Sequence, residues 1–210
     1  MDMPITHIIK KYWFRTVSVI VVSAAVIYFL VKIALVASSP KPFVPQDFTD
    51  ARGRGAIIAE EIVASSEASI TNLAIISQED EKGNYNDGLN LVSKEIQDNG
   101  VARAKALELS KQLEIMANNL NSIKPETAAR IGLEAVLNES QIVQRLINYN
   151  ADIRQLLDVL LSRFSNSGSV PNAKEKVKEL ISSMNDEAKA VNDLNNKYKD
   201  LMNQFDNLTK

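Results

Sequence analysis

An almost uncharged apolar segment near the amino terminus, residues 17–37 (VSVIVVSAAVIYFLVKIALVA), constrains this chain more than any other feature. Its 21 residues contain a single charge, Lys32. An α-helix rises about 1.5 Å per residue, so a helix of this length spans roughly 30 Å, the thickness of the hydrocarbon core of a bilayer. Lys32 lies near the far end, where its aliphatic stem allows the ammonium group to reach the headgroups. The segment therefore predicts a membrane-spanning helix.

A cleavable signal peptide is the alternative for this segment, because a signal also has a basic start and an apolar middle. Residues 36–38 (VAS) offer small side chains at which a signal could be cut. However, the apolar part of a signal typically has about 7–15 residues, fewer than residues 17–37, and the leader of residues 1–16 is also long for a signal. We therefore expect a retained signal anchor that crosses the bilayer once.

The basic side chains around the segment indicate its orientation. Before it, Lys10, Lys11 and Arg15 lie close together, whereas Lys41 and Arg52 after it are more widely spaced. Positive charge is enriched on the cytoplasmic side of membrane helices. The expected topology therefore places the amino terminus in the cytoplasm and the large domain that follows outside it.

The stretch after the anchor predicts a stiff connection to the rest of the chain. Residues 38–45 (SSPKPFVP) contain three prolines, and proline fixes φ and pushes the residue before it toward extended geometry. The Gly-Arg-Gly run at residues 53–55 lowers helix propensity further on. We therefore assign residues 38–55 to a stalk, in which Arg52 is expected to be solvated, and residues 56–210 to the folded domain.

Residues 56–210 predict an all-α fold. Apolar side chains recur at alternating steps of three and four, the period of a helix face that packs on other helices. The third segment shows this most clearly, at Ile142, Leu146, Tyr149, Ile153, Leu156, Leu160 and Phe164. The expected helices span about residues 56–80, 87–122, 125–166 and 171–208. Because the loops between them are short, we predict an antiparallel up-down four-helix bundle, or alternatively elongated helical hairpins that form a coiled coil.

Two details within these helices leave alternatives open. Gly100 interrupts the second helix at a cost of about 1 kcal/mol relative to alanine, so we expect either a kink or a close helix contact there. Asn148 and Asn150 in the third helix are either polar residues on an outer face or part of a polar layer in the core.

The composition argues against an enzyme. The chain has no cysteine, which excludes disulfides, thiolate nucleophiles and cysteine-based metal sites. The single histidine, His7, lies in the leader, across the predicted membrane from the domain, so no histidine-based triad or metal centre is expected there. We therefore assign no catalytic, cofactor-binding or metal-binding residues and no cofactor. A net charge of −2 and interrupted lysine clusters also provide no basic face for nucleic acid.

The acidic residues do not follow a metal-binding motif. Residues 79–88 (EDEKGNYNDG) have the composition of a calcium-binding loop. Aligning either Gly83 or Gly88 with the invariant glycine of an EF-hand loop, however, puts Leu89 or Lys94 where the bidentate glutamate belongs. We therefore interpret this segment as an acidic turn. The other acidic groups are spread over helix faces.

These features predict a non-catalytic protein that residues 17–37 hold at a membrane surface. The leading hypothesis is a scaffold, interaction or assembly module that binds a protein partner or further copies of itself. The alternative is a sensory or small-ligand-binding extracytoplasmic bundle. Since the leader of residues 1–16 is too short for a signalling domain, such a bundle would signal through a partner. A pocket lined by converging polar groups between the helices would favour the alternative, and a continuous packed core would disfavour it.

Overall fold

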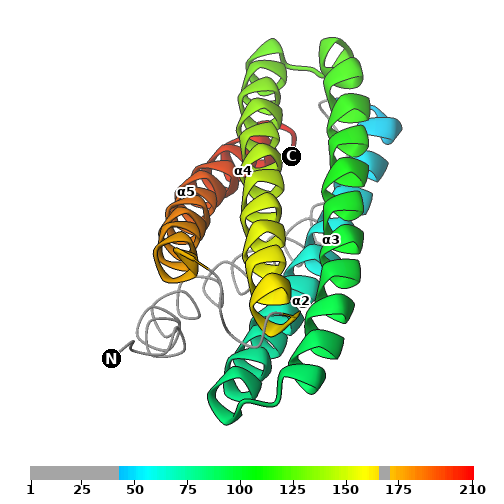
Figure 1. Cartoon of the computed structure of the whole chain (residues 1–210). Helices are drawn as coiled ribbons and strands as arrows, with labels where there is room; N and C mark the ends of the chain where they lie inside the picture. Colours follow the sequence, from blue (N-terminus) through cyan, green and yellow to red (C-terminus); the bar gives the residue numbers. More distant parts are fainter. Residues whose placement is uncertain (1–42, 166–170) are drawn as a thin grey trace.

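The computed structural model describes residues 43–165 and 171–210, and these residues form an all-helical fold with no strand among them. Four long helices follow one another: α2 (Gln46–Lys82), α3 (Tyr85–Asn119), α4 (Glu126–Ser165) and α5 (Ala173–Leu208), with a 3₁₀ turn, η1 (Leu120–Ser122), between α3 and α4. Consecutive helices run in opposite directions (Figure 1). The predicted all-α class is confirmed, and the arrangement is consistent with a helical bundle.

The predicted membrane anchor, residues 17–37, lies outside the described residues, as do the leader and the first part of the stalk. Among the helices that the structure describes, none combines the length and the apolar character that a membrane span requires. The anchor therefore stays a prediction from the sequence.

The periodic apolar positions form the buried faces of the helices. In α4, for example, Ile153, Leu156, Leu160 and Phe164 are each at most 4 % exposed. Helix propensity alone leaves a helix marginal in water, so burial of such stripes is what stabilises the four helices. The predicted bounds of the last three helices agree with the structure to within a few residues.

Within the described part of the chain, the buried apolar side chains form two clusters along the bundle. The first lies at the end where α2 begins and α5 finishes, where the rings of Phe48 and Phe205 stack with their centroids 5.3 Å apart. The second lies at the opposite end, where the rings of Tyr85 and Phe164 meet at 5.9 Å. The core is therefore divided along its length.

The start of α2 corrects the predicted boundary at residue 56. The helix begins at Gln46 and continues through both glycines, so much of the expected stalk is helical. Phe48 and Ala51 are each 1 % exposed, and their burial stabilises this extra length. A Cβ on Gly55 would lie 3.3 Å from Leu109 Cδ1, so the absent side chain allows α2 and α3 to pack closely. Tertiary contacts here outweigh the low helix propensity of glycine.

Gly100 marks no close helix contact, contrary to one of the two expectations for it. The residue is exposed, and a Cβ built there would meet no atom of the described residues within 4 Å. α3 runs through it as one continuous helix.

Candidate ligand-binding cavity

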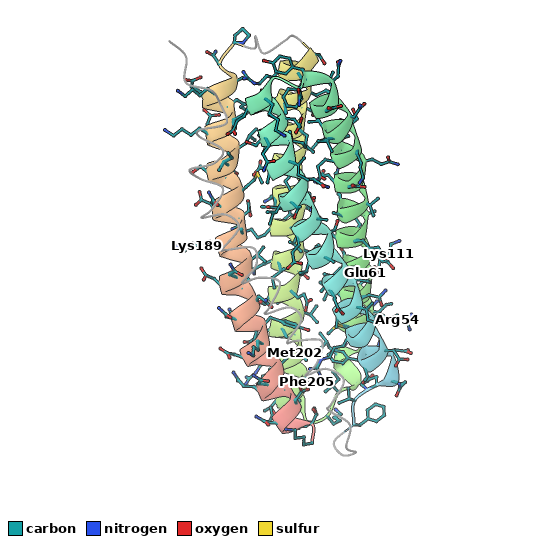
Figure 2. The ribbon with its side chains drawn as sticks, turned by 90° about the horizontal axis from the view of Figure 1, so that it is seen from below. Arg54, Glu61, Lys111, Lys189, Met202 and Phe205 are labelled. Carbon is teal, nitrogen blue, oxygen red and sulfur yellow. The ribbon has the colours of Figure 1, made fainter. Side chains whose placement is uncertain are left out.

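A cavity of about 50 Å³ lies between α2 and α5, within the cluster that contains Phe48 and Phe205. The backbones of α2 and α5 approach each other less closely than those of the consecutive pairs α2–α3, α3–α4 and α4–α5. A water molecule needs about 10–15 Å³ on the same measure, so the space is large enough for several atoms. Figure 2 shows Met202, which lines the cavity, on the inner side of α5, and Lys189 on its outer side.

All four helices contribute to the walls of the cavity. The apolar walls consist of aliphatic and thioether side chains from every helix, namely Ile62, Leu109, Leu113, Met116, Ile142, Leu146 and Met202. The polar groups are fewer: Arg52, Glu139, Asn195, Tyr198, Lys199 and Asn203. Mostly apolar walls with a few polar groups are typical of small-molecule sites.

Small residues on α2 leave the space open. Gly55, Ala56 and Ala59 line the cavity on this helix, whereas α5 contributes the longer side chains of Tyr198 and Met202. Alanine carries a single methyl group, so neither alanine can fill the gap to α5. The first third of α2 therefore sets the width of the cavity.

Glu139 of α4 and Tyr198 of α5 are hydrogen-bonded to each other in the wall, with the phenol donating to the carboxylate. Removal from water raises the pKa of Glu139 to about 7, although the hydrogen bond from Tyr198 and the charge of Arg52 act in the opposite direction. Burial also raises the pKa of Tyr198 well above its ordinary value, and the negative charge of Glu139 adds to this effect. Tyr198 thus stays protonated, while Glu139 changes charge near neutral pH.

Arg52, which lines the cavity near the start of α2, forms an ion pair with Asp206 of α5. Arg52 Nη1 donates to Asp206 Oδ1 at 2.7 Å, and Arg52 Nη2 donates to Asp206 Oδ2 at 2.9 Å. Burial acts to lower the pKa of Arg52, but the hydrogen bonds to Asp206 and the surrounding negative charge outweigh it, so the pKa is raised. The expectation that Arg52 lies in a solvated linker is therefore wrong, because α5 supplies a carboxylate that only the folded chain brings near it.

Asn195, a residue of the cavity wall, has an unpaired donor. The residue is 1 % exposed and lines the cavity from α5. Its Nδ2 is fully buried and has no hydrogen-bond partner among the residues that the structure describes. A buried donor without an acceptor costs about 1–3 kcal/mol. Such a group in a cavity wall is a candidate contact for a bound molecule.

Comparison of the chain with family models, curated proteins and solved structures gives no significant match.

Buried polar side chains lie among the apolar residues of the second cluster, near the end that faces the first cluster. Glu95 of α3 is 0 % exposed, and its Oε2 accepts a hydrogen bond of 2.7 Å from Asn72 Nδ2 on α2. Asn99 Nδ2 donates to Asn150 Oδ1 at 2.9 Å, and Asn150 Nδ2 donates to the Leu146 carbonyl at 2.8 Å. Of the two alternatives for Asn150, the structure supports the core layer.

The acidic turn forms ion pairs and does not gather metal ligands. Asp80 is 7 % exposed, and its Oδ1 accepts a hydrogen bond of 2.9 Å from Arg163 Nε on α4. Glu79 pairs with Lys82 at 2.7 Å, and this contact together with Asn84 lowers its pKa. Within residues 43–165 and 171–210, no group of three or more acidic or histidine side chains is placed to hold a metal ion.

The cavity residues were not assigned as site residues from the sequence. Tyr198 lies in the apolar stripe of α5 and is buried there. Asn195 lies on the same stripe, between Val191 and Tyr198 at steps of four and three. A polar residue at an apolar position was the one local signal that could have indicated the site.

Proposed function

We propose that this protein is a membrane-tethered helical bundle that binds a small molecule in the cavity between α2 and α5. The observation that carries the proposal is the buried Nδ2 of Asn195, which lacks an acceptor among the described residues and belongs to a largely apolar cavity wall. Ligand sites commonly combine apolar walls with a few polar groups that orient the ligand. A molecule bound here would satisfy the amide and bury its own apolar surface.

The position of the cavity suits a protein that is tethered at its amino terminus. The cavity lies beside the first turns of α2, the helix that follows the predicted anchor and stalk directly. In this proposal, residues 17–37 cross the bilayer once, with the amino terminus in the cytoplasm and an antiparallel up-down bundle outside it. A ligand bound between α2 and α5 would change how these helices pack at the tethered end, and a partner protein would respond to that change.

The ligand-binding proposal can be tested with a cavity-filled variant. Full-length protein in lipid nanodiscs, with ¹³C-labelled methionine methyl groups, would be screened against a set of neutral, cationic and anionic small molecules. We expect binders to shift the Met202 methyl signal of the unmodified protein, and Ala59→Leu, which fills the cavity, to abolish the shift. Ala64→Leu changes an exposed position of the same helix and is the matched control. Binders that act equally on Ala59→Leu, or an absence of any binder, would contradict the proposal.

The tether requires a separate test. We expect the full-length protein to stay in the membrane fraction after alkaline carbonate extraction, and a variant that lacks residues 17–37 to become extractable. Protease added to intact cells or spheroplasts should cleave the bundle and spare the leader. Extraction of the full-length protein by carbonate would rule out the membrane span. Protection of the bundle from the added protease would indicate the opposite orientation.

Exposed apolar side chains favour a second candidate function, that of a scaffold or assembly module. Leu133 and Leu137 lie one turn apart on α4 and are 43 % and 55 % exposed. Surface leucines at this spacing are common in helix-binding faces. If this face holds a partner or a second copy, crosslinking in native membranes should give a defined larger species that Leu133→Asp removes and Glu134→Gln retains. A monomer with no crosslinked partner would exclude this function.

A further inference from the structure

The hydrogen-bonding groups around the cavity restrict the chemistry of a ligand there. Asn195 lines the cavity, and no acceptor for its Nδ2 exists in the described part of the chain. An amide nitrogen donates hydrogen bonds and accepts none. The complementary atom of a ligand is therefore an acceptor, such as a carbonyl or ether oxygen.

The charged side chains around the cavity already have partners. Arg52 forms two hydrogen bonds with Asp206, and Glu139 accepts a hydrogen bond from the Tyr198 hydroxyl. Lys199 also interacts with a neighbouring group. A charged ligand would have to displace one of these partners or leave its own charge in apolar surroundings, and both are costly. These pairings favour an uncharged ligand.

The walls favour an aliphatic body of limited length. They are formed by isoleucine, leucine and methionine side chains, whose flexible chains adapt to aliphatic groups. The volume of about 50 Å³ admits only a few atoms. The ligand is therefore short.

We propose that the cavity binds a neutral, short aliphatic molecule that carries one hydrogen-bond acceptor oxygen, with this oxygen bonded to Asn195 Nδ2. The proposal rests on the ligand-binding function above and adds the chemical class of the ligand. The aliphatic part lies against Leu113, Met116 and Ile142, where it replaces water or empty space. Methyl ketones are the simplest probes of this class.

The test compares molecules of matched shape that differ at the acceptor. The probes are 2-butanone, 2-methyl-1-butene, in which CH₂ replaces the oxygen, and sec-butylammonium. They are titrated into full-length protein in nanodiscs at pH 8, where Glu139 carries its charge. The readout is the methyl signals of Met116 and Met202 in the cavity wall, and Met184 in the other apolar cluster is the internal control.

We expect 2-butanone to bind roughly tenfold more tightly than 2-methyl-1-butene, because only the ketone accepts the Asn195 hydrogen bond. In Asn195→Leu the ratio should fall to about one, whereas Asn196→Leu, at the adjacent exposed position that does not line the cavity, should retain it. Each probe partitions into lipid to the same extent whichever protein is present. Comparing the ketone-to-alkene affinity ratio between the unmodified and variant proteins therefore removes the effect of this partitioning. Retention of the preference in Asn195→Leu would overturn the proposal, since another group would then be the donor.

The remaining outcomes separate this inference from the proposed function. Equal binding of the ketone and the alkene, or tightest binding of sec-butylammonium, would overturn the ligand class and leave a ligand-binding cavity in place. If no probe moves the methyl signals, water alone fills the cavity and both proposals fail. Extending the ketone to 2-hexanone should weaken binding, because the volume of about 50 Å³ admits only a few atoms, and undiminished binding would contradict this limit on ligand size.

Discussion

Arg52 and Asp206, which lie 154 residues apart in the chain, are joined by a two-point ion pair between the first turns of α2 and the last turns of α5. Their side chains retain 13 % and 9 % exposure, so the pair is largely removed from water. The Phe48–Phe205 stack packs the same two helices together. These contacts hold α2 and α5 together beside the cavity.

Loss of one partner of this pair should destabilise the bundle. We expect Arg52→Met to reduce the free energy of unfolding by about 3 kcal/mol, because the carboxylate of Asp206 would stay buried without a counter-charge. Arg54→Met, two residues further on at an exposed position, is the control and should change stability by less than about 0.5 kcal/mol. Urea unfolding followed by circular dichroism would measure both, and equal effects would show that the Arg52 pair is not stabilising.

Glu139 should make stability depend on pH. Its pKa is about 7 in the folded protein and close to 4.5 when the chain is unfolded. The folded state therefore favours the protonated acid, and this contribution is complete below about pH 4.5 and lost as the pH rises to 7. The loss should be about 2–3 kcal/mol, because a tenfold change in proton affinity corresponds to about 1.4 kcal/mol and part of the side chain is accessible to water.

Glu139→Gln removes this titration and isolates its effect. The neighbouring Arg52 of α2 and Tyr198 of α5 do not change charge between pH 4.5 and 8, since the pKa of each is raised. The stability of the unmodified protein relative to Glu139→Gln should therefore decline across this range. A constant difference between the two proteins would show that Glu139 has an ordinary pKa.

Two glycines of α3 should respond to alanine in opposite ways. A Cβ on Gly88 would lie 2.6 Å from Phe164 Cε2, so Gly88→Ala should destabilise the fold by about 1–3 kcal/mol through overpacking. Gly100→Ala meets open space and should stabilise it by about 0.5–1 kcal/mol, because alanine loses less backbone freedom in a helix. Thermal unfolding of the two variants would show the contrast, and a similar melting temperature for both would refute the packing at Gly88.

The Asn99–Asn150 hydrogen bond should appear as a coupling energy. Asn150→Leu leaves Asn99 Nδ2 buried without its acceptor and should cost about 1–3 kcal/mol. The double replacement of both asparagines by leucine should cost less than the sum of the single changes, by about 1 kcal/mol or more. A double-mutant cycle from urea unfolding would measure this. Strict additivity would mean that the two amides do not interact.

The helices were predictable because their signal is local. The steps of three and four between Ile153, Leu156 and Leu160 follow from the helical repeat, and the structure buries these residues as expected. The start of α2 was not predictable in this way. Glycine lowers helix propensity wherever it occurs in a helix, and the contact of Gly55 with Leu109 that compensates for it comes from a different helix.

The sequence by itself determined the all-α class, the faces of the helices that are buried, and a candidate membrane span at residues 17–37. These depend on the spacing and length of apolar runs, which a linear chain displays directly. Only the tertiary structure decided that Arg52 is buried against Asp206, and that Glu139, Asn195 and Tyr198 line one cavity. These residues come from three helices, and their burial and partners depend on how the helices pack against each other.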